Sequence, residues 1–211
     1  EKDEFYKRPY VGARFSRGIY YPKIGYLNVN AEFGGLYYQS QLEQGVLSVT
    51  GEAISNLHYF NRLKFREFLS FNYTRGINRF DDEKVFINKD NIWGLSSDLL
   101  YGIQKLSFHS EVILFSDLYI YNFRFLFHGF GDLGMIGPEN VSIFSNQLYS
   151  GIGIGVRVRN ENLVFKTVHI RFAYYPVVPN DVEHFNLLIS GENNTRPTNF
   201  EPVKPYLTPY E

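Results

Sequence analysis

The chain has 211 residues, which is enough for one ordinary domain, and its 21 lysine and arginine residues nearly balance its 22 aspartate and glutamate residues. The net charge is therefore close to zero, and the composition gives no sign of a basic surface for nucleic acid or anionic lipid. The absence of cysteine excludes disulfides and thiolate metal sites. No run of about 18 apolar residues occurs, which excludes a transmembrane helix.

Aromatic residues make up 18% of the chain, and together with valine and isoleucine they favour strands, whereas alanine is scarce. Nine segments alternate apolar and polar side chains with a period of two, which predicts strands with one apolar face. In chain order the predicted strands are 9–20, 26–38, 45–57, 62–76, 104–116, 121–132, 149–160, 163–175 and 183–190.

The stretch 149–160, YSGIGIGVRVRN, shows the alternation clearly. Its even positions from 152 to 158 are isoleucine or valine, and its odd positions from 151 to 159 carry three glycines followed by two arginines. A nucleotide-binding loop would place such glycines between a strand and a helix. Here strand character continues through Arg159, so the three glycines are predicted to lie inside a strand.

Two architectures fit alternating strands of this length: a soluble sandwich or barrel with a polar exterior, and a membrane barrel with an apolar exterior and a polar lumen. In a soluble fold the glycines would face water, where they pack against nothing and weaken the strand. In a membrane barrel they leave room for a loop in the lumen, and the aromatic residues form girdles at the membrane interfaces. We therefore predict an all-β fold, with residues 1–190 forming an antiparallel transmembrane β-barrel segment in a bacterial outer membrane.

The connections between the predicted strands alternate in length, as in barrels with long external loops and short periplasmic turns. Segments 77–103 and 134–147 are assigned to the outside, and 160–162 to a tight periplasmic turn. Nine strands is an odd number, whereas a complete bacterial barrel usually has an even number. We therefore expect the C-terminal part of a larger barrel, with a second copy of the chain in a homo-oligomer as the open alternative. Residues 191–211, rich in proline, predict an extended periplasmic tail.

Six segments carry a resemblance to a known family: REFLSFNYTRGINRF at 66–80, NIWGL at 91–95, SEVILF at 110–115, FGDLG at 130–134, YSGIGIGVRVRNENLVF at 149–165 and IRFAYYP at 170–176. Their order and spacing resemble the C-terminal barrel region of the BamA/TamA-type outer-membrane assembly and secretion superfamily, the bacterial surface antigens. The resemblance implies a sixteen-stranded barrel preceded by periplasmic polypeptide-transport-associated domains. It also implies that the protein inserts or translocates polypeptides at a seam between the first and last strands.

The resemblance further implies a long external loop that folds back into the lumen and carries a Val/Ile-Arg-Gly-Phe/Tyr tip. The arginine of that tip lies against inward carboxylates of the next two strands. Alignment by order gives these site residues: Ile92, Trp93, Gly94 and Leu95 as the tip, and Glu111 and Asp132 as the carboxylates. Trp93 stands where the family has arginine, so another cation is expected near the carboxylates. The candidates are Arg75, Arg79, Lys89, Arg124 and Arg157, and a plain packing role for both carboxylates is the alternative.

We expect no catalytic residue, metal site or cofactor. The chain has no G-x-S-x-G, H-E-x-x-H or phosphate-loop motif, and its five histidines lack metal-ligand spacing. The expected partners are the lipid bilayer and either client polypeptides or the upstream domains of a longer chain, and no nucleic acid. Two alternatives to insertion stay open: a barrel that anchors an upstream domain such as a patatin-like lipase, and a small solute channel.

Overall fold

The computed structural model describes residues 9–38, 41–61, 63–89, 91–160, 167–192 and 210. In these residues the regular structure consists of strands and one short 3-10 helix, η1 (Ile143–Ser145). The long strands are β1 (Tyr10–Tyr21), β2 (Gly25–Tyr38), β3 (Gln41–Ser55), β5 (Leu63–Ile77), β8 (Gln104–Ile120), β9 (Phe123–Gly137), β10 (Leu148–Asn160), β11 (Thr167–Val177) and β12 (Phe185–Glu192). The short strands are β4 (His58–Phe60), β6 (Val85–Phe86) and β7 (Tyr101–Gly102).

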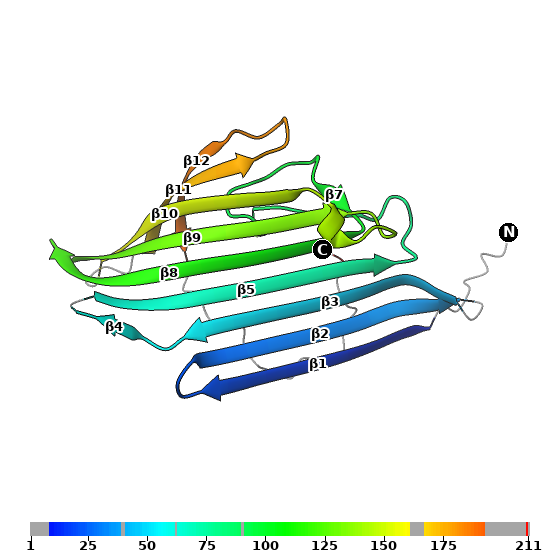
Figure 1. Cartoon of the computed structure of the whole chain (residues 1–211), viewed down its shortest axis with the longest axis horizontal. Coiled ribbons are helices and arrows are strands. Elements are labelled where there is room, and N and C mark those ends of the chain that lie inside the picture. Colours follow the sequence, from blue (N-terminus) through cyan, green and yellow to red (C-terminus); the bar gives the residue numbers. More distant parts are fainter. Residues whose placement is uncertain are drawn as a thin grey trace.

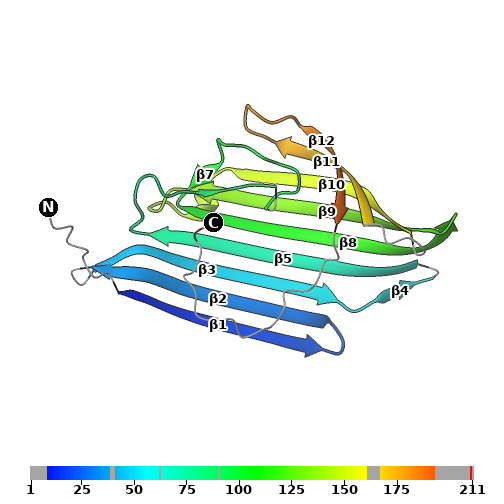
Figure 2. The same cartoon turned by 180° about the vertical axis from the view of Figure 1, so that it is seen from behind.

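The nine long strands form one curved antiparallel sheet in chain order, from β1 at one edge to β12 at the other (Figures 1 and 2). The sequence-based prediction of nine antiparallel strands is thus confirmed. Strand β4 extends the sheet beside β5, and β6 pairs with β7 apart from it. In the described part of the chain, β1 pairs with β2 alone and β12 with β11 alone. In these residues the sheet is open, and its two edges do not meet to close a barrel.

Some predicted strand ends are wrong, and turn chemistry explains the largest error. The predicted connection 117–120 belongs to β8, and the chain reverses instead at Tyr121 and Asn122, which have φ values of 48° and 67°. Two successive residues with positive φ form the tight hairpin turn that matches strand twist. Strand β9 also continues to Gly137, so the long connection begins at residue 138 rather than 134. The predicted connection 58–61 contains β4.

The strands have two ends, which we name by their connections. The turn end carries the connections 22–24, 56–62 and 121–122, and the loop end carries 78–103, 138–147 and 178–184. Both long segments assigned to the outside thus lie at one end of the sheet. The turn predicted at 160–162 lies largely outside the described residues, as does the predicted tail 191–211, of which Gly191 and Glu192 belong to β12. Tyr210 lies at the loop end, where its hydroxyl donates a hydrogen bond to the Ile103 carbonyl at 2.8 Å.

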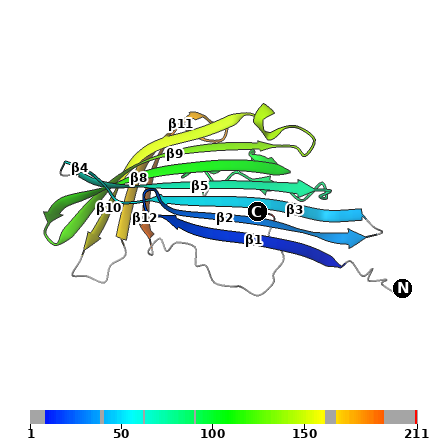
Figure 3. The same cartoon turned by 60° about the horizontal axis from the view of Figure 1, so that its bottom comes forward.

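The two faces of the sheet differ in polarity as the alternation predicted. Most side chains on the convex face are apolar and exposed, and Ile154 in the middle of β10 is 68% exposed. Arg17 and Glu67 are exceptions, because their cross-strand partners are the convex residues Val29 and Val112. The concave face is polar, as in the row where the Ser16 hydroxyl donates to Asn30 and the Asn30 amide donates to Thr50. Figure 3 shows the curvature that separates these faces. No helix among the described residues has the length and apolar character needed to cross a membrane.

Candidate functional site

The connection between β5 and β8 lies over the concave face of β8 to β12. The connection contains the β6–β7 pair, and beside that pair the Ile87 N–H donates to the Leu100 carbonyl at 3.0 Å. The apolar side chains of this connection point toward the sheet and make the buried core of the chain. The members of this core are Ile87, Ile92, Leu95 and Leu100 from the connection and Phe130, Ala173 and Tyr175 from the sheet.

The glycines of β10 provide the space in which this core packs. A Cβ atom on Gly151 would lie 3.1 Å from both Ile92 and Tyr175, and one on Gly153 would lie 2.4 Å from Phe130. A Cβ on Gly155 would lie 2.5 Å from the His128 ring. The three glycines therefore lie inside a strand and do not form a nucleotide-binding loop. Because they have no side chains, larger side chains from neighbouring elements pack directly against the strand backbone.

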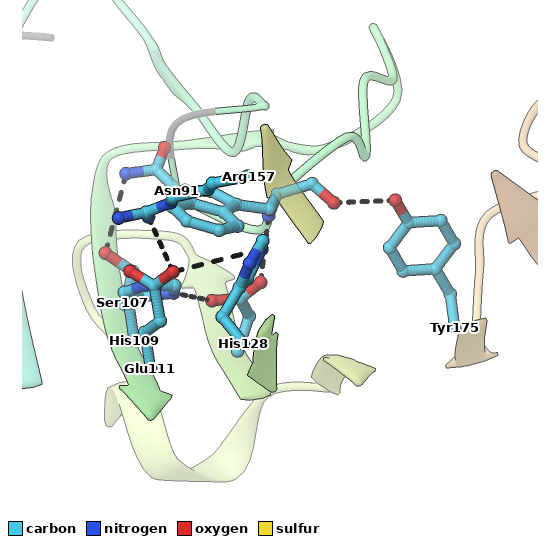
Figure 4. Close-up of polar contacts among 9 residues, drawn as sticks. Asn91, Ser107, His109, Glu111, His128, Arg157 and Tyr175 are labelled. Carbon is cyan, nitrogen blue, oxygen red and sulfur yellow. Dashed lines mark hydrogen bonds and ion pairs between the residues drawn. The ribbon is translucent and has the colours of Figure 1, made fainter. Parts of the chain in front are cut away.

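Three strands hold the backbone of the tip, residues 92–95. The Trp93 N–H donates to the Asp132 carboxylate of β9 at 3.0 Å. The Tyr175 hydroxyl of β11 donates to the Trp93 carbonyl at 2.6 Å, and the Asn186 amide of β12 donates to the Gly94 carbonyl at 2.8 Å. Figure 4 shows the Tyr175 contact together with the polar cluster on the strands. Gly94 has φ +80°, a conformation that favours glycine.

The Trp93 ring occupies the centre of an aromatic and cationic cluster. Its centroid lies 4.4 Å from the His109 ring and 5.0 Å from the Phe130 ring. The Arg171 guanidinium of β11 lies 4.3 Å from the Trp93 ring, within the range of a cation–π interaction. The family resemblance implied an arginine in the tip that contacts the strands. In this chain the positions are exchanged, because Arg171 lies on a strand and contacts Trp93 in the tip.

Both carboxylates of the predicted site are buried and have cationic or histidine partners on neighbouring strands. Glu111 is 6% exposed, and its Oε1 lies 2.6 Å from Arg157 Nη2 of β10 and 3.9 Å from His128 Nε2. Asp132 is 1% exposed and contacts His109 Nδ1 of β8. Arg157 reaches Glu111 across the intervening strand β9, so the ion pair links β8 to β10 on the concave face.

The other candidate cations lie elsewhere. Arg79 pairs with Glu83 at 3.1 Å, and Arg75 Nη2 donates to the Glu139 carbonyl at 3.5 Å, both at the loop end. Lys89 is exposed. Arg124 lines a cavity nearer the turn end. The expectation that Arg75, Arg79 or Lys89 would take the place of the tip arginine is therefore wrong for the described contacts, because their side chains bind partners at the loop end or point to solvent.

Sequence reasoning missed several residues that hold the tip segment. Lys105 is 4% exposed, and its Nζ donates to the Phe86 carbonyl at 3.2 Å and to Asn91 Oδ1 at 3.3 Å. The Asn91 amide in turn donates to the Ser107 hydroxyl at 3.4 Å. The alternation pattern already placed Lys105 and Ser107 on the polar face. It contained no signal that a segment from another part of the chain would bury them.

Three of the histidines, His109, His128 and His169, lie on the concave face. His128 and His169 are buried with ring centroids 5.2 Å apart, and His109 contacts Asp132. Within the described ranges, no group of three or more histidine, aspartate or glutamate side chains is arranged to hold a metal ion. The arrangement can fix a loop to a sheet through buried polar contacts.

Comparisons with protein-family profiles, with curated proteins and with solved structures find no match to this chain. The family resemblance seen in the sequence therefore stays a prediction. The structure itself shows an apolar convex face, a polar concave face, and a segment from the loop end that lies on the concave face beside Glu111 and Asp132.

Proposed function

We propose that this chain is the C-terminal part of a β-barrel in a bacterial outer membrane that inserts or translocates polypeptides, as in the BamA/TamA-type superfamily. The observation that carries the proposal is the inverted polarity of the sheet. Exposed side chains such as Phe15, Ile154 and Leu187 lie on the convex face, whereas Glu111 and Asp132 are buried on the concave face. This is the polarity of a barrel wall with lipid outside and a filled lumen inside.

The position of the tip supports the link to that superfamily. Its backbone donates to Asp132, and Glu111 lies on the adjacent strand with its own cationic partner. A long loop folded onto two inward carboxylates is the arrangement that the resemblance implies. The chemistry is changed, because Trp93 and Arg171 form a cation–π contact where the family has a loop arginine facing the carboxylates.

The strand count supports a barrel completed by further strands. Strands β1 and β12 run in the same direction, because eight successive antiparallel pairings, an even number, separate them. Joining these two edges directly would require parallel pairing, and a second copy of the chain in the same membrane orientation would create two parallel junctions. A wholly antiparallel barrel therefore needs an odd number of additional strands. Pairing with a second copy of the chain therefore does not close a wholly antiparallel barrel.

Strand β12 supplies the seam in the proposed mechanism. An edge strand with unpaired N–H and C=O groups in lipid is costly, so it can template an incoming strand by β-augmentation. The Tyr175 N–H donates to the His184 carbonyl at 2.8 Å, which sets the hydrogen-bonding register of β11 and β12. Because N–H directions alternate along an antiparallel strand, the N–H groups of Phe185, Leu187 and Ile189 point to the open edge.

The experiment tests this edge. The full-length gene product is reconstituted in lipid vesicles with an unfolded barrel protein, and formation of the folded, heat-resistant form of that client is followed on gels. Leu187→Pro removes one N–H from the edge and leaves the β11–β12 ladder intact, so folding of the client should slow to the rate with empty vesicles. Leu187→Ser keeps the N–H and should retain activity. Equal client folding with wild type, both variants and empty vesicles would refute the insertion function.

A non-inserting anchor is the second candidate, and Trp93 favours it. The loss of the family's tip arginine removes the charged contact on which the comparison with assembly proteins depends, while the remaining contacts still fix the segment firmly. For an anchor, the client assay would be negative, and deletion of the barrel would release the upstream domain from the membrane fraction. An open solute channel is less consistent with a concave face whose C-terminal half is covered by its own connection.

A further inference from the structure

The tip contacts the edge strand β12 directly. The Asn186 amide donates to the Gly94 carbonyl at 2.8 Å, so a side chain of β12 binds the backbone of the tip. Two residues further along the strand, Leu188 lies against the same glycine, since a Cβ atom added to Gly94 would lie 2.3 Å from Leu188 Cδ1. Asn186 and Leu188 flank the exposed Leu187 of the convex face, so both side chains point to the concave side.

A third concave side chain of β12 reaches the tip through β11. Ser190 Oγ accepts a hydrogen bond from Arg171 Nη2 at 3.1 Å, and the Arg171 guanidinium lies 4.3 Å from the Trp93 ring. Three consecutive inward positions of β12 are therefore joined to the tip. Two of them are joined directly, and the third is joined through Arg171.

The tip also contacts strands inside the sheet, so it connects β12 to the rest of the wall. The Trp93 N–H donates to Asp132 of β9, and β9 is separated from β12 by the strands β10 and β11. The buried Tyr175 of β11 donates to the Trp93 carbonyl. Strand β12 is thus held in two ways, by its backbone pairing with β11 and by a tip that is itself bound to β9 and β11.

The opposite edge of the sheet is held differently. On β1 the Ser16 hydroxyl donates to Asn30 of the next strand, β2. Arg14 of β1 likewise pairs with Glu32 of β2. Because the tip packs over β9 and β11, its contacts among the described residues strengthen the β12 edge and not the β1 edge. An edge strand belongs to the parts of a fold that open most easily, so a few added contacts change how often it leaves the sheet.

We propose that the tip is a clamp that holds β12 in line with the wall and thereby regulates the opening of the seam. While Asn186 and Leu188 contact Gly94, β12 can move away from the wall only by breaking contacts that extend to β9. Release of the tip lowers the cost of that movement, and β12 can then pair with an incoming strand. The regulation of the seam rests on the proposed insertion function, whereas the clamp rests on the contacts alone.

Hydrogen exchange of the β12 amides tests the clamp, measured by mass spectrometry on the full-length gene product in lipid vesicles. Asn186→Ala removes the bond to Gly94 and should speed this exchange about fivefold, which is the effect of one ordinary hydrogen bond on a local opening. Asn30→Ala is the matched control, because it removes an inward amide of the same kind from β2 and should leave β12 exchange unchanged. Equal exchange in wild type and Asn186→Ala would overturn the clamp.

A reversible lock tests the regulation of the seam. The chain has no cysteine, and the side chains at positions 94 and 188 lie within reach of a disulfide, so Gly94→Cys combined with Leu188→Cys allows the tip to be crosslinked to β12. The oxidised double variant should lose the ability to fold an unfolded client barrel protein, and a reductant should restore it. Equal client folding by the oxidised and reduced forms would overturn the proposed regulation.

The two readouts separate the clamp from the insertion function. Faster β12 exchange in Asn186→Ala, together with no client folding by wild type, would refute insertion and support the clamp. Client folding by wild type with unchanged β12 exchange in Asn186→Ala would support insertion and overturn the clamp. Circular dichroism verifies that each variant keeps its strand content. If Asn186→Ala does not fold, slower β12 exchange in the oxidised than in the reduced double variant provides the same test.

Discussion

The C-terminal part of the sheet, β8 to β12, and the N-terminal part, β1 to β3, share the same strand pattern but differ on their concave faces. The buried apolar cluster is formed by the segment 87–100 with β9 and β11, and all of it lies over the C-terminal part. On β1 to β3 the same face carries polar side chains such as Ser16, Asn30 and Thr50, hydrogen-bonded to one another. The alternation of apolar and polar residues along a strand thus identifies its polar face. Whether the side chains of that face are buried depends on a second segment, here 87–100, that covers them.

The largest expected effect comes from breaking the buried ion pair of the covered part. Glu111→Ala leaves Arg157 without its partner in a buried site and should cost about 3–5 kcal/mol of unfolding free energy. Glu32→Ala breaks the more exposed Arg14 pair of the N-terminal part and should cost only about 0.2–1 kcal/mol. Urea unfolding of both variants in lipid vesicles measures the contrast. Equal costs would mean that the two concave faces are equally hydrated.

A charge on the convex face should affect both parts alike. Ile154→Arg on β10 should destabilise the protein in a bilayer by about 2–4 kcal/mol, because the central convex position of the strand would lie near the midplane. Val29→Arg on the convex face of β2 is expected to have a similar cost. Folding yield in vesicles tests the pair. Recovery of either variant as a stable, detergent-free monomer in water would contradict the membrane proposal.

Backbone strain gives a smaller contrast between the parts. Gly94→Ala should cost about 1–2 kcal/mol, since a side chain disfavours φ +80° and its Cβ would lie 2.3 Å from Leu188. Gly51→Ala on β3 meets no atom closer than 3.9 Å and should be neutral or slightly stabilising. Limited proteolysis of the 78–103 connection, faster in the first variant and unchanged in the second, would report the release of the tip. Unchanged cleavage in both would place the strain elsewhere.

The smallest expected effect is a pH dependence at the loop end. Burial raises the pKa of Tyr210 from 10.0 to about 12, and the nearby Arg79 guanidinium opposes that rise. Since the folded-state pKa is higher than the unfolded one, the contact with Ile103 is fully present below pH 10 and is lost as the pH rises toward 12. A difference titration of phenolate absorbance between wild type and Tyr210→Phe isolates this tyrosine. A midpoint near 10 would show that the hydroxyl is exposed.

The number and direction of the strands could be predicted because period-two alternation is a local property of the sequence. The reversal at Tyr121 and Asn122 was missed, since a two-residue turn without glycine gives a weak signal in a stretch of aromatic residues. The partners of the carboxylates were only partly predictable. Arg157 was among the candidates, but choosing it over Arg79 or Lys89 requires the curvature that brings β10 toward β8.

The hydrogen bond from Asn186 to the Gly94 carbonyl has a consequence for the order of folding. Each long strand pairs with the next one in the chain, so the sheet can grow hairpin by hairpin through contacts of short sequence separation. The tip is different, because its partners Asp132, Tyr175 and Asn186 follow it by 39, 82 and 92 residues. The tip therefore cannot make all its contacts until the last two strands are in place, so its docking reports that the wall beneath it is complete.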